Sequence, residues 1–475
     1  MNFYFEAVSV LDKLDAKKGS IKGVLASVPE KNRKRTAALV IETLKYKQVL
    51  SEVIDAAQLL KQEKKINSRN LALVLIHDLL LAKGIQAGDG PIKQAVLRHR
   101  TRLNGEFQRV KIKRGATSTA ELAQTDDARA ASIPRYVRVN QTCWTVADAL
   151  ETFQERGYQE GDPLSFPKAF QQDQHIPNLF AFHPSVRFTE DSLYTSGKII
   201  LQDKASCFPA HVLSPPARED AVVIDATSAP GNKASHLCAI MQNKGKLYAF
   251  ERDRKRFSTL KKMLAKAHCN NVEAVNLDFL TVSPNDPKYG CATHILLDPS
   301  CSGSGIVNRM DHLLDNAEEE DDGDSERLNK LAAFQLKMIR HAMAFPSVQR
   351  IVYSTCSVHA VENEHVVRQA LKTEEAISGN FKLAPKRDIL PAWHRRGIPD
   401  EMDEPVHADS LVRCSPGEDG TNGFFVSLFV RANDAEDEWQ GTSMNPKKRK
   451  TVDDADSGPP AAKRKRKKKS KSATM

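Results

Sequence analysis

Apolar residues recur at helical spacing through the first hundred residues of the chain. The clearest run comprises Leu39, Ile41, Leu44, Leu50, Ile54 and Leu59. Basic residues occupy many of the positions between them, so each predicted helix has an apolar face and a charged face. This pattern predicts a helical bundle. Within it, Asn67 or Ser68 can cap a helix that runs to Gly84, a residue type common at helix ends.

The pattern changes at residue 105, where the chain becomes polar and rich in small residues. The stretch TSTAELAQTDDARAAS is typical of this range. We interpret 105–132 as a linker that follows a basic helical domain, 1–104. From Ile133 onward, RYVRVN alternates like a strand, WTVADALETFQERG is helix-like and KIILQDKAS ends the segment. Residues 133–205 are therefore predicted to form a small α/β module.

From Ala221 the chain alternates between short apolar runs and amphipathic segments. The apolar runs are AVVIDAT, KLYAFE, VEAVN, HILLD and RIVYST, and NGFFVSLFVR reads as a final strand. Helix-like segments such as NKASHLCAIMQ and RKRFSTLKKMLAKAH lie between them. This alternation predicts an α/β domain over 206–432, with a mostly parallel sheet covered on both faces. Ligands of such sheets bind at the carboxyl ends of the strands.

The charge of the chain is unevenly distributed. The whole chain has a net charge of +10, 40% hydrophobic residues and 27% charged residues, which excludes a wholly disordered protein. Residues 1–114 carry +12, the tail from Lys447 carries +9, and the middle carries −11. Basic ends suit a polyanionic partner such as nucleic acid. The alternative is a solvated charged surface without a partner.

Two strongly charged segments stand apart from the predicted domains. Eight acidic residues lie between Asp315 and Glu326, and we expect an acidic insertion at 315–326, either a surface loop or a regulatory element. The tail, 433–475, is predicted to be disordered and contains PKKRK and KRKRKKKSK. Such a pair resembles a two-part nuclear localisation signal, which predicts a nuclear import receptor as a partner.

The cysteine pattern and the hydropathy exclude several classes of protein. Eight cysteines are scattered without a CxxC pair, so neither a zinc ribbon nor a disulfide framework is expected, and we predict no metal site. The N-terminus lacks the apolar core of a signal peptide, and the most apolar window, Leu71 to Ala82, is too short to span a membrane. We predict a protein of a reducing compartment without a membrane.

Acidic residues follow four consecutive predicted strands, namely Asp225, Glu251, Asp278 and Asp298. The loop DATSAPGNKAS after the first strand matches neither GxGxxG nor a phosphate-binding P-loop. A carboxylate after the second strand can accept both hydroxyls of a ribose. Any one of these acids could be a helix cap, but four in register favour a nucleoside ligand without pyrophosphate.

Two cysteines also follow strands. Cys301 lies in DPSCSGSG and Cys356 in YSTCS, so both thiols should lie at the carboxyl edge of the sheet near Asp298. An isolated free cysteine is usually packed as a small apolar residue. Two at matched strand ends favour chemistry, and a redox pair is the alternative that leaves the acids unexplained.

The motifs TSAPGNK, FERDRKR, LDF, LLDPSCSGSG and VYSTCSVHAVENE, in this order, resemble those of the Sun-domain (Fmu/RsmB-type) RNA cytosine-C5 methyltransferase family. The resemblance covers about residues 133–432. The basic helical N-terminus and the DPSCSGSG variant are most similar to the eukaryotic nucleolar members that methylate large-subunit ribosomal RNA. The family usually has Asp, any residue, Pro, Cys, whereas this chain has Asp298, Pro299, Ser300, Cys301, and Asn232 stands where Gly is common.

The resemblance implies a seven-stranded, Rossmann-like S-adenosylmethionine-dependent methyltransferase sheet and assigns roles to residues. It implies that Cys356 is the nucleophile and that Cys301 assists release. The chemistry of the reaction adds Asp298 as the candidate acid near the ring and Lys233 as a cation that can lower the pKa of the thiol. The implied cofactor residues are Thr227, Ser228, Ala229, Pro230, Gly231, Asn232, Lys233, Glu251, Arg256, Asp278 and Asp298.

A covalent mechanism explains why two thiols and an acid are useful. A thiolate that adds at C6 of cytosine makes C5 nucleophilic, and protonation of N3 assists the addition. The target base must first be unstacked. Because the middle of the chain is acidic, the RNA-binding side chains are predicted to be Arg98, Arg100, Arg102, Arg109, Lys111, Lys113, Arg114, Arg135 and Arg138.

We therefore expect an rRNA cytosine-C5 methyltransferase of the nucleus and nucleolus that acts in ribosome biogenesis on pre-ribosomal particles. One alternative is the same chemistry on transfer RNA or another RNA. The other is a mainly non-catalytic RNA-binding assembly factor.

Overall fold

The computed structural model describes residues 2–16, 18–19, 21–124, 127–307, 313 and 322–432. The predicted nuclear localisation signal and residues 315–321 of the predicted acidic insertion lie outside these residues. Residues 322–326 of that insertion are helical, because α15 begins at Asp322. Among the described residues, none of the helices is both long enough and apolar enough to cross a membrane.

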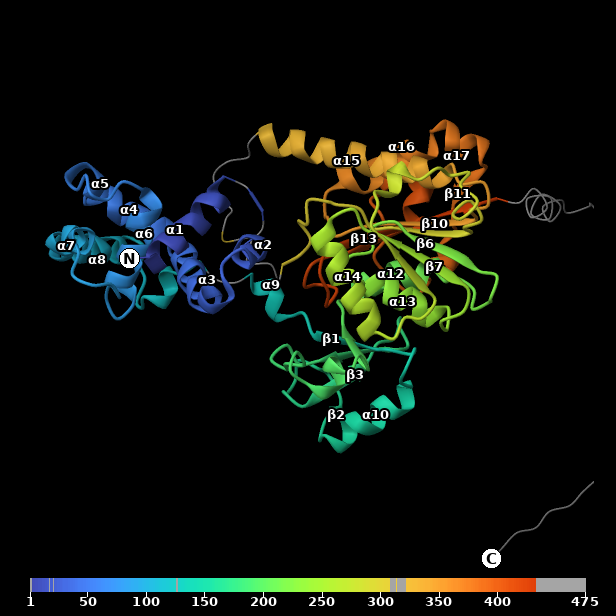
Figure 1. Ribbon diagram of the computed structural model, residues 1–475, viewed down its shortest axis with the longest axis horizontal. Coiled ribbons are helices and arrows are strands. Elements are labelled where there is room, and N and C mark those ends of the chain that lie inside the picture. Colours follow the sequence, from blue (N-terminus) through green and yellow to red (C-terminus); the bar gives the residue numbers. More distant parts are fainter. Residues whose placement is uncertain are drawn as a thin grey trace, which may run out of the picture. The chain divides into compact units, whose positions relative to one another are not determined.

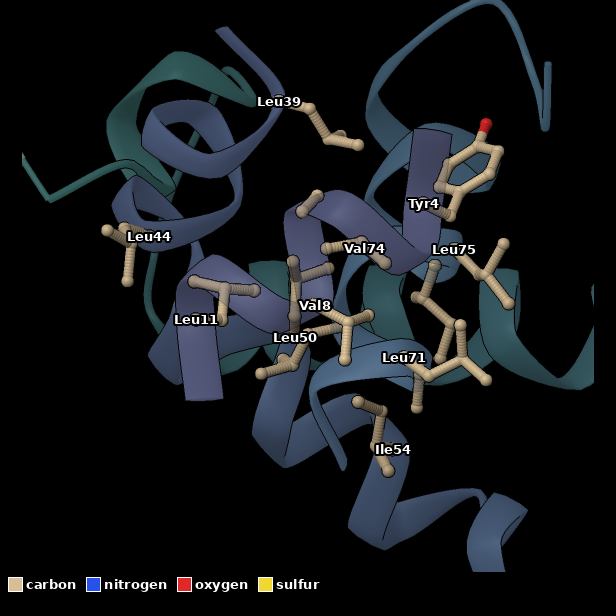
Figure 2. Packing of buried hydrophobic residues seen from close by; sticks show 14 of the residues in the cluster. Tyr4, Val8, Leu11, Leu39, Leu44, Leu50, Ile54, Leu71, Val74 and Leu75 are labelled. Carbon is tan, nitrogen blue, oxygen red and sulfur yellow. The ribbon is translucent and has the colours of Figure 1, made fainter. Parts of the chain in front are cut away.

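The N-terminal region is helical, as its apolar spacing predicts. Its helices are α1 (Asn2–Asp15), α2 (Ile21–Ala26), α3 (Glu30–Lys45), α4 (Lys47–Ala56), α5 (Leu59–Gln62), α6 (Arg69–Leu81), α7 (Pro91–Arg98) and α8 (Arg100–Lys113). Figure 2 shows Leu39, Leu44, Leu50 and Ile54 packed in their common core. Ser68 caps α6 by accepting a hydrogen bond from the Leu71 amide, which confirms one of the two predicted caps.

Helix α8 continues through residues that we expected to be linker. Leu103, Phe107 and Val110 are buried at spacings of four and three, so the apolar stripe of the helix extends to Lys113. Leu122, in the short 3-10 helix η1 (Ala120–Leu122), is also buried in the helical core. The linker prediction is therefore wrong for 105–113, because a sparse apolar stripe was hidden among charged residues.

A second region forms a five-stranded sheet. Its strands are β1 (Arg135–Val139), β2 (Gln159–Glu160), β3 (Ala169–Gln172), β4 (Leu179–Phe182) and β5 (Ile199–Leu201), in the order β2-β3-β4-β1-β5. The helices α10 (Val146–Glu155) and α11 (Ser192–Thr195) accompany it, after the short α9 (Ala128–Ala131). Phe153 of α10 packs edge-on against Phe170, Phe180 and Phe182 of the sheet, which fixes the helix against one face.

The third region contains the larger sheet, in the order β11-β13-β10-β9-β6-β7-β8. Its parallel strands are β6 (Val222–Asp225), β7 (Lys246–Phe250), β8 (Val272–Val275), β9 (His294–Leu297) and β10 (Arg350–Thr355), and β13 (Phe424–Arg431) runs antiparallel to β10. The strands β11 (Phe381–Leu383) and β12 (Leu411–Cys414) both pair with β13. The predicted α/β methyltransferase-type sheet is confirmed, with β12 as an addition to the seven-strand path.

Helices cover both faces of the larger sheet. The helices α12 (Lys204–Leu213), α13 (Asn232–Ile240) and α14 (Arg254–Lys266) lie on one side, and α15 (Asp322–Met343), α16 (Glu364–Leu371) and α17 (Glu374–Ser378) lie on the other (Figure 1). Alternate strand residues enter different cores: Val223 packs with the first group and Ile224 with the second. Because both faces are buried, the strands are almost wholly apolar.

Candidate active site

A cleft of about 450 Å³ opens at the carboxyl ends of the parallel strands. Strands β6, β7, β9 and β10 each deliver a polar residue or a thiol to its wall directly after the strand ends. The lining residues are Ala226, Thr227, Glu251, Arg252, Arg256, Leu277, Asp278, Phe279, Asp298, Pro299, Ser300, Cys301, Phe334, Met338 and Cys356. The structure thus brings together side chains that are up to 130 positions apart in the chain.

The loop Thr227–Lys233 joins β6 to α13. Gly231, just before α13, has φ +119°, and a Cβ there would lie 3.3 Å from Cδ1 of Leu260. Glycine is therefore the residue that fits both the backbone angle and the close approach of α14. Thr227 lines the cleft, whereas Ser228, Ala229, Pro230, Gly231 and Asn232 shape the turn without lining it.

Lys233 lies in the first turn of α13 and forms an ion pair with Asp298. Its Nζ lies 2.8 Å from Oδ2 of Asp298 and 3.1 Å from Oγ of Ser206. Burial lowers the pKa of Lys233, but the charge of Asp298 and the hydrogen bond to it outweigh burial, so the pKa is raised above its ordinary value. Lys233 is therefore a cation at neutral pH.

Both oxygens of Asp298 accept hydrogen bonds. Oδ1 accepts from Oγ of Ser354 at 2.8 Å, opposite the Oδ2 contact with Lys233. The backbone N–H of Asp298 donates to Oγ1 of Thr227 at 3.1 Å. These contacts fix the carboxylate in an accepting role between β9, β10 and α13.

Two other acids lie on the cleft wall. Glu251 is 5% exposed; its Oε1 accepts from the Asp253 amide, and its Oε2 is 3.5 Å from the Arg256 guanidinium. Arg256 also donates to the carbonyl of Ala229. Asp278 caps the short helix η2 (Phe279–Thr281) by accepting from the Leu280 amide. Asp278 is therefore a helix cap, the alternative that we considered for any single acid. It also lines the cleft.

The two thiols lie together. Sγ of Cys301 and Sγ of Cys356 are 3.1 Å apart and share a hydrogen bond. That hydrogen bond, together with burial and the charge of Cys356, raises the pKa of Cys301 well above its ordinary value. Cys301 is therefore held as a thiol beside Cys356.

Comparisons with known proteins agree with this arrangement. The family model for the N-terminal domain of NOL1/NOP2/Sun domain family member 5 matches residues 34–123, and the model for its ferredoxin-like domain matches 133–202. The 16S rRNA methyltransferase RsmB/F model matches 210–430. The chain is 45% identical to the 25S rRNA (cytosine-C(5))-methyltransferase rcm1 of Schizosaccharomyces pombe, with 90% of this chain and 91% of the relative covered.

The chain belongs to the NOL1/NOP2/Sun domain family. It is also 41% identical to the mouse 28S rRNA (cytosine-C(5))-methyltransferase, with 91% of each chain covered.

Solved structures share the fold of this Sun-domain protein. The crystal structure of PH0851 has a TM-score of 0.60 at 19% identity and covers 90% of this chain and 97% of its own. A methyltransferase homologue from Pyrococcus horikoshii has a TM-score of 0.51 at 20% identity, with 79% and 99% covered. At these identities the likeness supports the fold alone.

The residues predicted to bind RNA differ in whether they pair with a carboxylate in the structure of the Sun-domain protein. Arg98, Arg109 and Arg114 pair with Glu63, Glu106 and Glu52, and Arg102 donates to the carbonyl of Ala56. Within the described ranges, no carboxylate pairs with Arg100, Lys111 or Lys113.

Arg138 is placed differently from the other basic residues. Its side chain is fully buried; Nε donates to Oε1 of Gln202, and the guanidinium donates to Oγ of Ser235 and the carbonyl of Asn232. Arg135, on the same strand, is exposed. The prediction that Arg138 contacts RNA is wrong for this structure, because strand alternation turns its side chain toward α13.

The apolar part of the cleft was missed from the sequence. Leu277, Phe279, Phe334 and Met338 form this wall. Phe334 and Met338 are four residues apart on α15, a spacing that places them on one helix face. That spacing was the available signal, but it does not distinguish a cleft wall from ordinary core. Among the described residues, no group of three or more His, Cys, Asp or Glu side chains could hold a metal ion.

Proposed function

We propose that this Sun-domain protein transfers a methyl group from S-adenosylmethionine to C5 of a cytosine in large-subunit ribosomal RNA. The observation that carries the proposal is the pair of thiols 3.1 Å apart. They share one cleft with Asp298, which is paired with Lys233. Relatives at 45% and 41% identity over about nine-tenths of the chain carry the names of enzymes with this activity.

The residues of the cleft fit S-adenosylmethionine. Three carboxylates, Glu251, Asp278 and Asp298, suit a ligand with a positively charged sulfonium and a ribose, and the apolar wall beside Asp278 suits an adenine ring. The loop Thr227–Lys233 and Arg256 complete the set of residues that would hold it. When bound, this cofactor supplies the activated methyl group.

The thiols act on the RNA base. A lone pair of the Cys356 thiolate forms the bond to C6, and the C5–C6 double-bond pair makes C5 nucleophilic. Lys233 carries a proton within 2.8 Å of Asp298, so the Lys233–Asp298 pair supplies the proton that N3 of the ring needs.

Release depends on a change in Cys301. Once Cys356 is bonded to carbon, its sulfur no longer carries the charge and hydrogen bond that raise the pKa of Cys301. Burial and the charge of Asp298 still raise the pKa of Cys301, but without the Cys356 hydrogen bond and charge that pKa falls, so Cys301 can pass its proton to solvent and then accept the proton from C5. The C5–C6 double bond re-forms, N3 returns its proton to the Lys233–Asp298 pair, and the electrons of the sulfur–carbon bond return to Cys356.

The parts of the chain have separate roles in this proposal. The helical region, which the structure extends to Leu122, and the small module, 133–205, bind RNA, while 206–432 carries the reaction. The basic tail directs the protein through an import receptor to the nucleus and nucleolus, where pre-ribosomal particles are its substrates.

The proposal is tested by methyl transfer from labelled S-adenosylmethionine to unmodified large-subunit RNA, with denaturing gels to detect protein–RNA adducts. We expect transfer by the unaltered protein, neither transfer nor adduct with Cys356→Ala, and a trapped adduct with Cys301→Ala. An adduct that forms with Cys356→Ala but not with Cys301→Ala would mean that the roles of the two cysteines are reversed. Faster transfer to transfer RNA would change the substrate, and RNA binding without transfer to any RNA would favour the assembly-factor alternative.

A further inference from the structure

The residues on either side of Cys301 are held by a buried pair of side chains. Oε1 of Glu362 accepts from the backbone N–H of Ser302 at 2.9 Å and from Nε2 of Gln335 at 3.0 Å. Gln335 also donates to the carbonyl of Ser300 at 3.1 Å. Glu362 and Gln335 are both fully buried, so Cys301 is fixed from both neighbours by contacts beneath the cleft.

The residues on either side of Cys356 are held by Asn363, which follows Glu362 in the chain. Oδ1 of Asn363 accepts from Oγ1 of Thr355 at 2.6 Å, and Nδ2 donates to the carbonyl of Ser357 at 3.0 Å. Asn363 is fully buried as well. The amide of Gly305 donates to the carbonyl of Cys356 at 2.9 Å, which ties the first cysteine loop to the second.

The burial of the Glu362 carboxylate lowers the stability of the fold. Glu362 forms no ion pair within the described part of the chain, and its Oε2 has no hydrogen-bond partner there. A buried polar atom without a hydrogen-bond partner lowers the free energy of unfolding. By contrast, the neighbouring Glu364 is paired with the Arg413 guanidinium at 2.6 Å. Neither Glu362 nor Asn363 lines the cleft, so contact with a ligand does not explain them.

We propose that Glu362 and Asn363 are positioning residues that set the separation of the two thiols, Glu362 through the Cys301 loop and Asn363 through the Cys356 loop. Because the two are adjacent in the chain, the short helix η4 (Ala360–Glu362) and the start of α16 act as a common support for both loops. The part of this inference that concerns catalysis rests on the proposed function, whereas the part that concerns thiol geometry does not.

The first experiment measures thiol proximity without RNA or cofactor. Diamide, an azo compound, takes two electrons and two protons from two thiols as they form a disulfide. The thiols start at 3.1 Å, against a disulfide bond of about 2.05 Å. The rate is followed by alkylation of the remaining thiols and mass spectrometry of the Cys301 and Cys356 peptides.

We expect Glu362→Ala and Asn363→Ala each to slow this cross-link about tenfold or more. Glu362→Gln should retain the rate, because its Oε1 can still accept from Ser302 and Gln335. The matched control is Asn271→Ala, which removes a buried amide that donates to the carbonyl of Lys244, away from the thiol loops. If Glu362→Ala does not fold, Gln335→Met removes the second tie to the Cys301 loop and should also slow the cross-link.

Unchanged rates in the folded Glu362→Ala, Asn363→Ala and Gln335→Met variants would overturn the inference. So would a slow Glu362→Gln variant, or an Asn271→Ala variant as slow as the others.

The second experiment separates the two loops by the step each serves. Asn363→Ala should lower the rate of RNA adduct formation, since it loosens the loop of the nucleophile. Glu362→Ala should form the adduct and release it slowly, so that adduct accumulates as with Cys301→Ala. The same effect on both steps in both variants would contradict the division of roles. An absence of adduct in the unaltered protein would count against the proposed function and leave the cross-linking result standing.

Discussion

At the scale of single residues, burial and neighbouring charge decide which side chains of the site hold a proton. Lys233 keeps its proton because Asp298 is 2.8 Å away. Cys301 keeps its proton because Cys356 is its hydrogen-bond partner, with burial of Cys301 adding to the effect. Asp225, at the end of β6, is 1% exposed and has one oxygen, Oδ2, without a hydrogen-bond partner in the described ranges. Three adjacent groups thus depart from their ordinary pKa values for different physical reasons.

Asp225 provides a prediction of pH-dependent stability. Burial raises its pKa to about 7; the charge of Asp298 adds to this, while the Thr227 amide and Lys233 oppose it. An unfolded aspartate has a pKa of about 3.9. Between these values the folded protein keeps a proton that the unfolded chain has released, so the free energy of unfolding falls as pH rises from about 4 to about 7.

The Asp225→Asn variant is neutral at every pH and isolates this effect. Without cofactor, its free energy of unfolding relative to the unaltered protein should rise through the same pH window, by at most a few kcal/mol, and level off above it. Urea denaturation at closely spaced pH values measures the difference. A difference that does not change with pH would show that Asp225 is ionised in the folded protein.

At the scale of elements, β1 carries two arginines with opposite surroundings. Both faces of the strand are buried beyond its first residue, so Arg135, at the start of the strand, is exposed, whereas Arg138 is fully buried on the face it shares with Tyr136. Arg138 connects the small module to α13 through Asn232 and Ser235. The helix that follows the Thr227–Lys233 loop is therefore supported by a strand outside the larger sheet.

The different burial of Arg138 and Arg135 predicts that substituting them will have different effects on stability and on RNA binding. Arg138→Met removes the buried donor to Oε1 of Gln202 and Oγ of Ser235, while the carbonyl of Asn232 keeps the Ser235 hydroxyl. The variant should lower the free energy of unfolding by about 2–4 kcal/mol. Arg135→Ala should change it by less than about 0.5 kcal/mol and should weaken RNA binding instead. Urea denaturation and RNA titration of both variants measure this. Equal stability of the two variants would mean that the Arg138 contacts contribute nothing to the fold.

At the scale of the whole molecule, charge is unevenly distributed along the chain. Residues 1–114 carry a net +12 while the middle of the chain carries −11. The structure refines this division, because several basic residues of α7 and α8 are already paired with glutamates. An arginine that is paired with a carboxylate has less net attraction for a phosphate. We therefore expect the unpaired basic residues to dominate RNA binding.

Two double substitutions with the same change in net charge test this expectation. Replacing Arg100 and Lys113 by alanine should weaken RNA binding and reduce the slope of affinity against salt by roughly 0.7–0.9 for each lost phosphate contact. Replacing Arg109 and Arg114, which are paired, should have a smaller effect on both. Binding is measured by titration at several salt concentrations. Equal effects would mean that only net charge matters.

The sequence by itself determined the order of elements and the chemistry at the strand ends. Apolar runs and amphipathic periods are local properties, so the strands from Val222 to Thr355 and the helices α13 and α14 follow from them. The parallel arrangement then required the acids after the strands and the two cysteines to meet at one edge. The structure places Glu251, Asp278, Asp298, Cys301 and Cys356 on the cleft wall, whereas Asp225, the first of the four predicted acids, is buried at the end of β6 and does not line the cleft.

Only the tertiary structure decided which side chains support that edge. Glu362 and Asn363 hold the cysteine loops, and Arg138 is buried against α13 rather than exposed. Nothing in the local pattern distinguishes a buried glutamate from an exposed one, because hydrogen-bond partners at separations of 60 residues or more are created by the packing of the chain. Hydrophobic periodicity depends on the residues of one segment only, whereas the burial of a polar group depends on every segment packed around it.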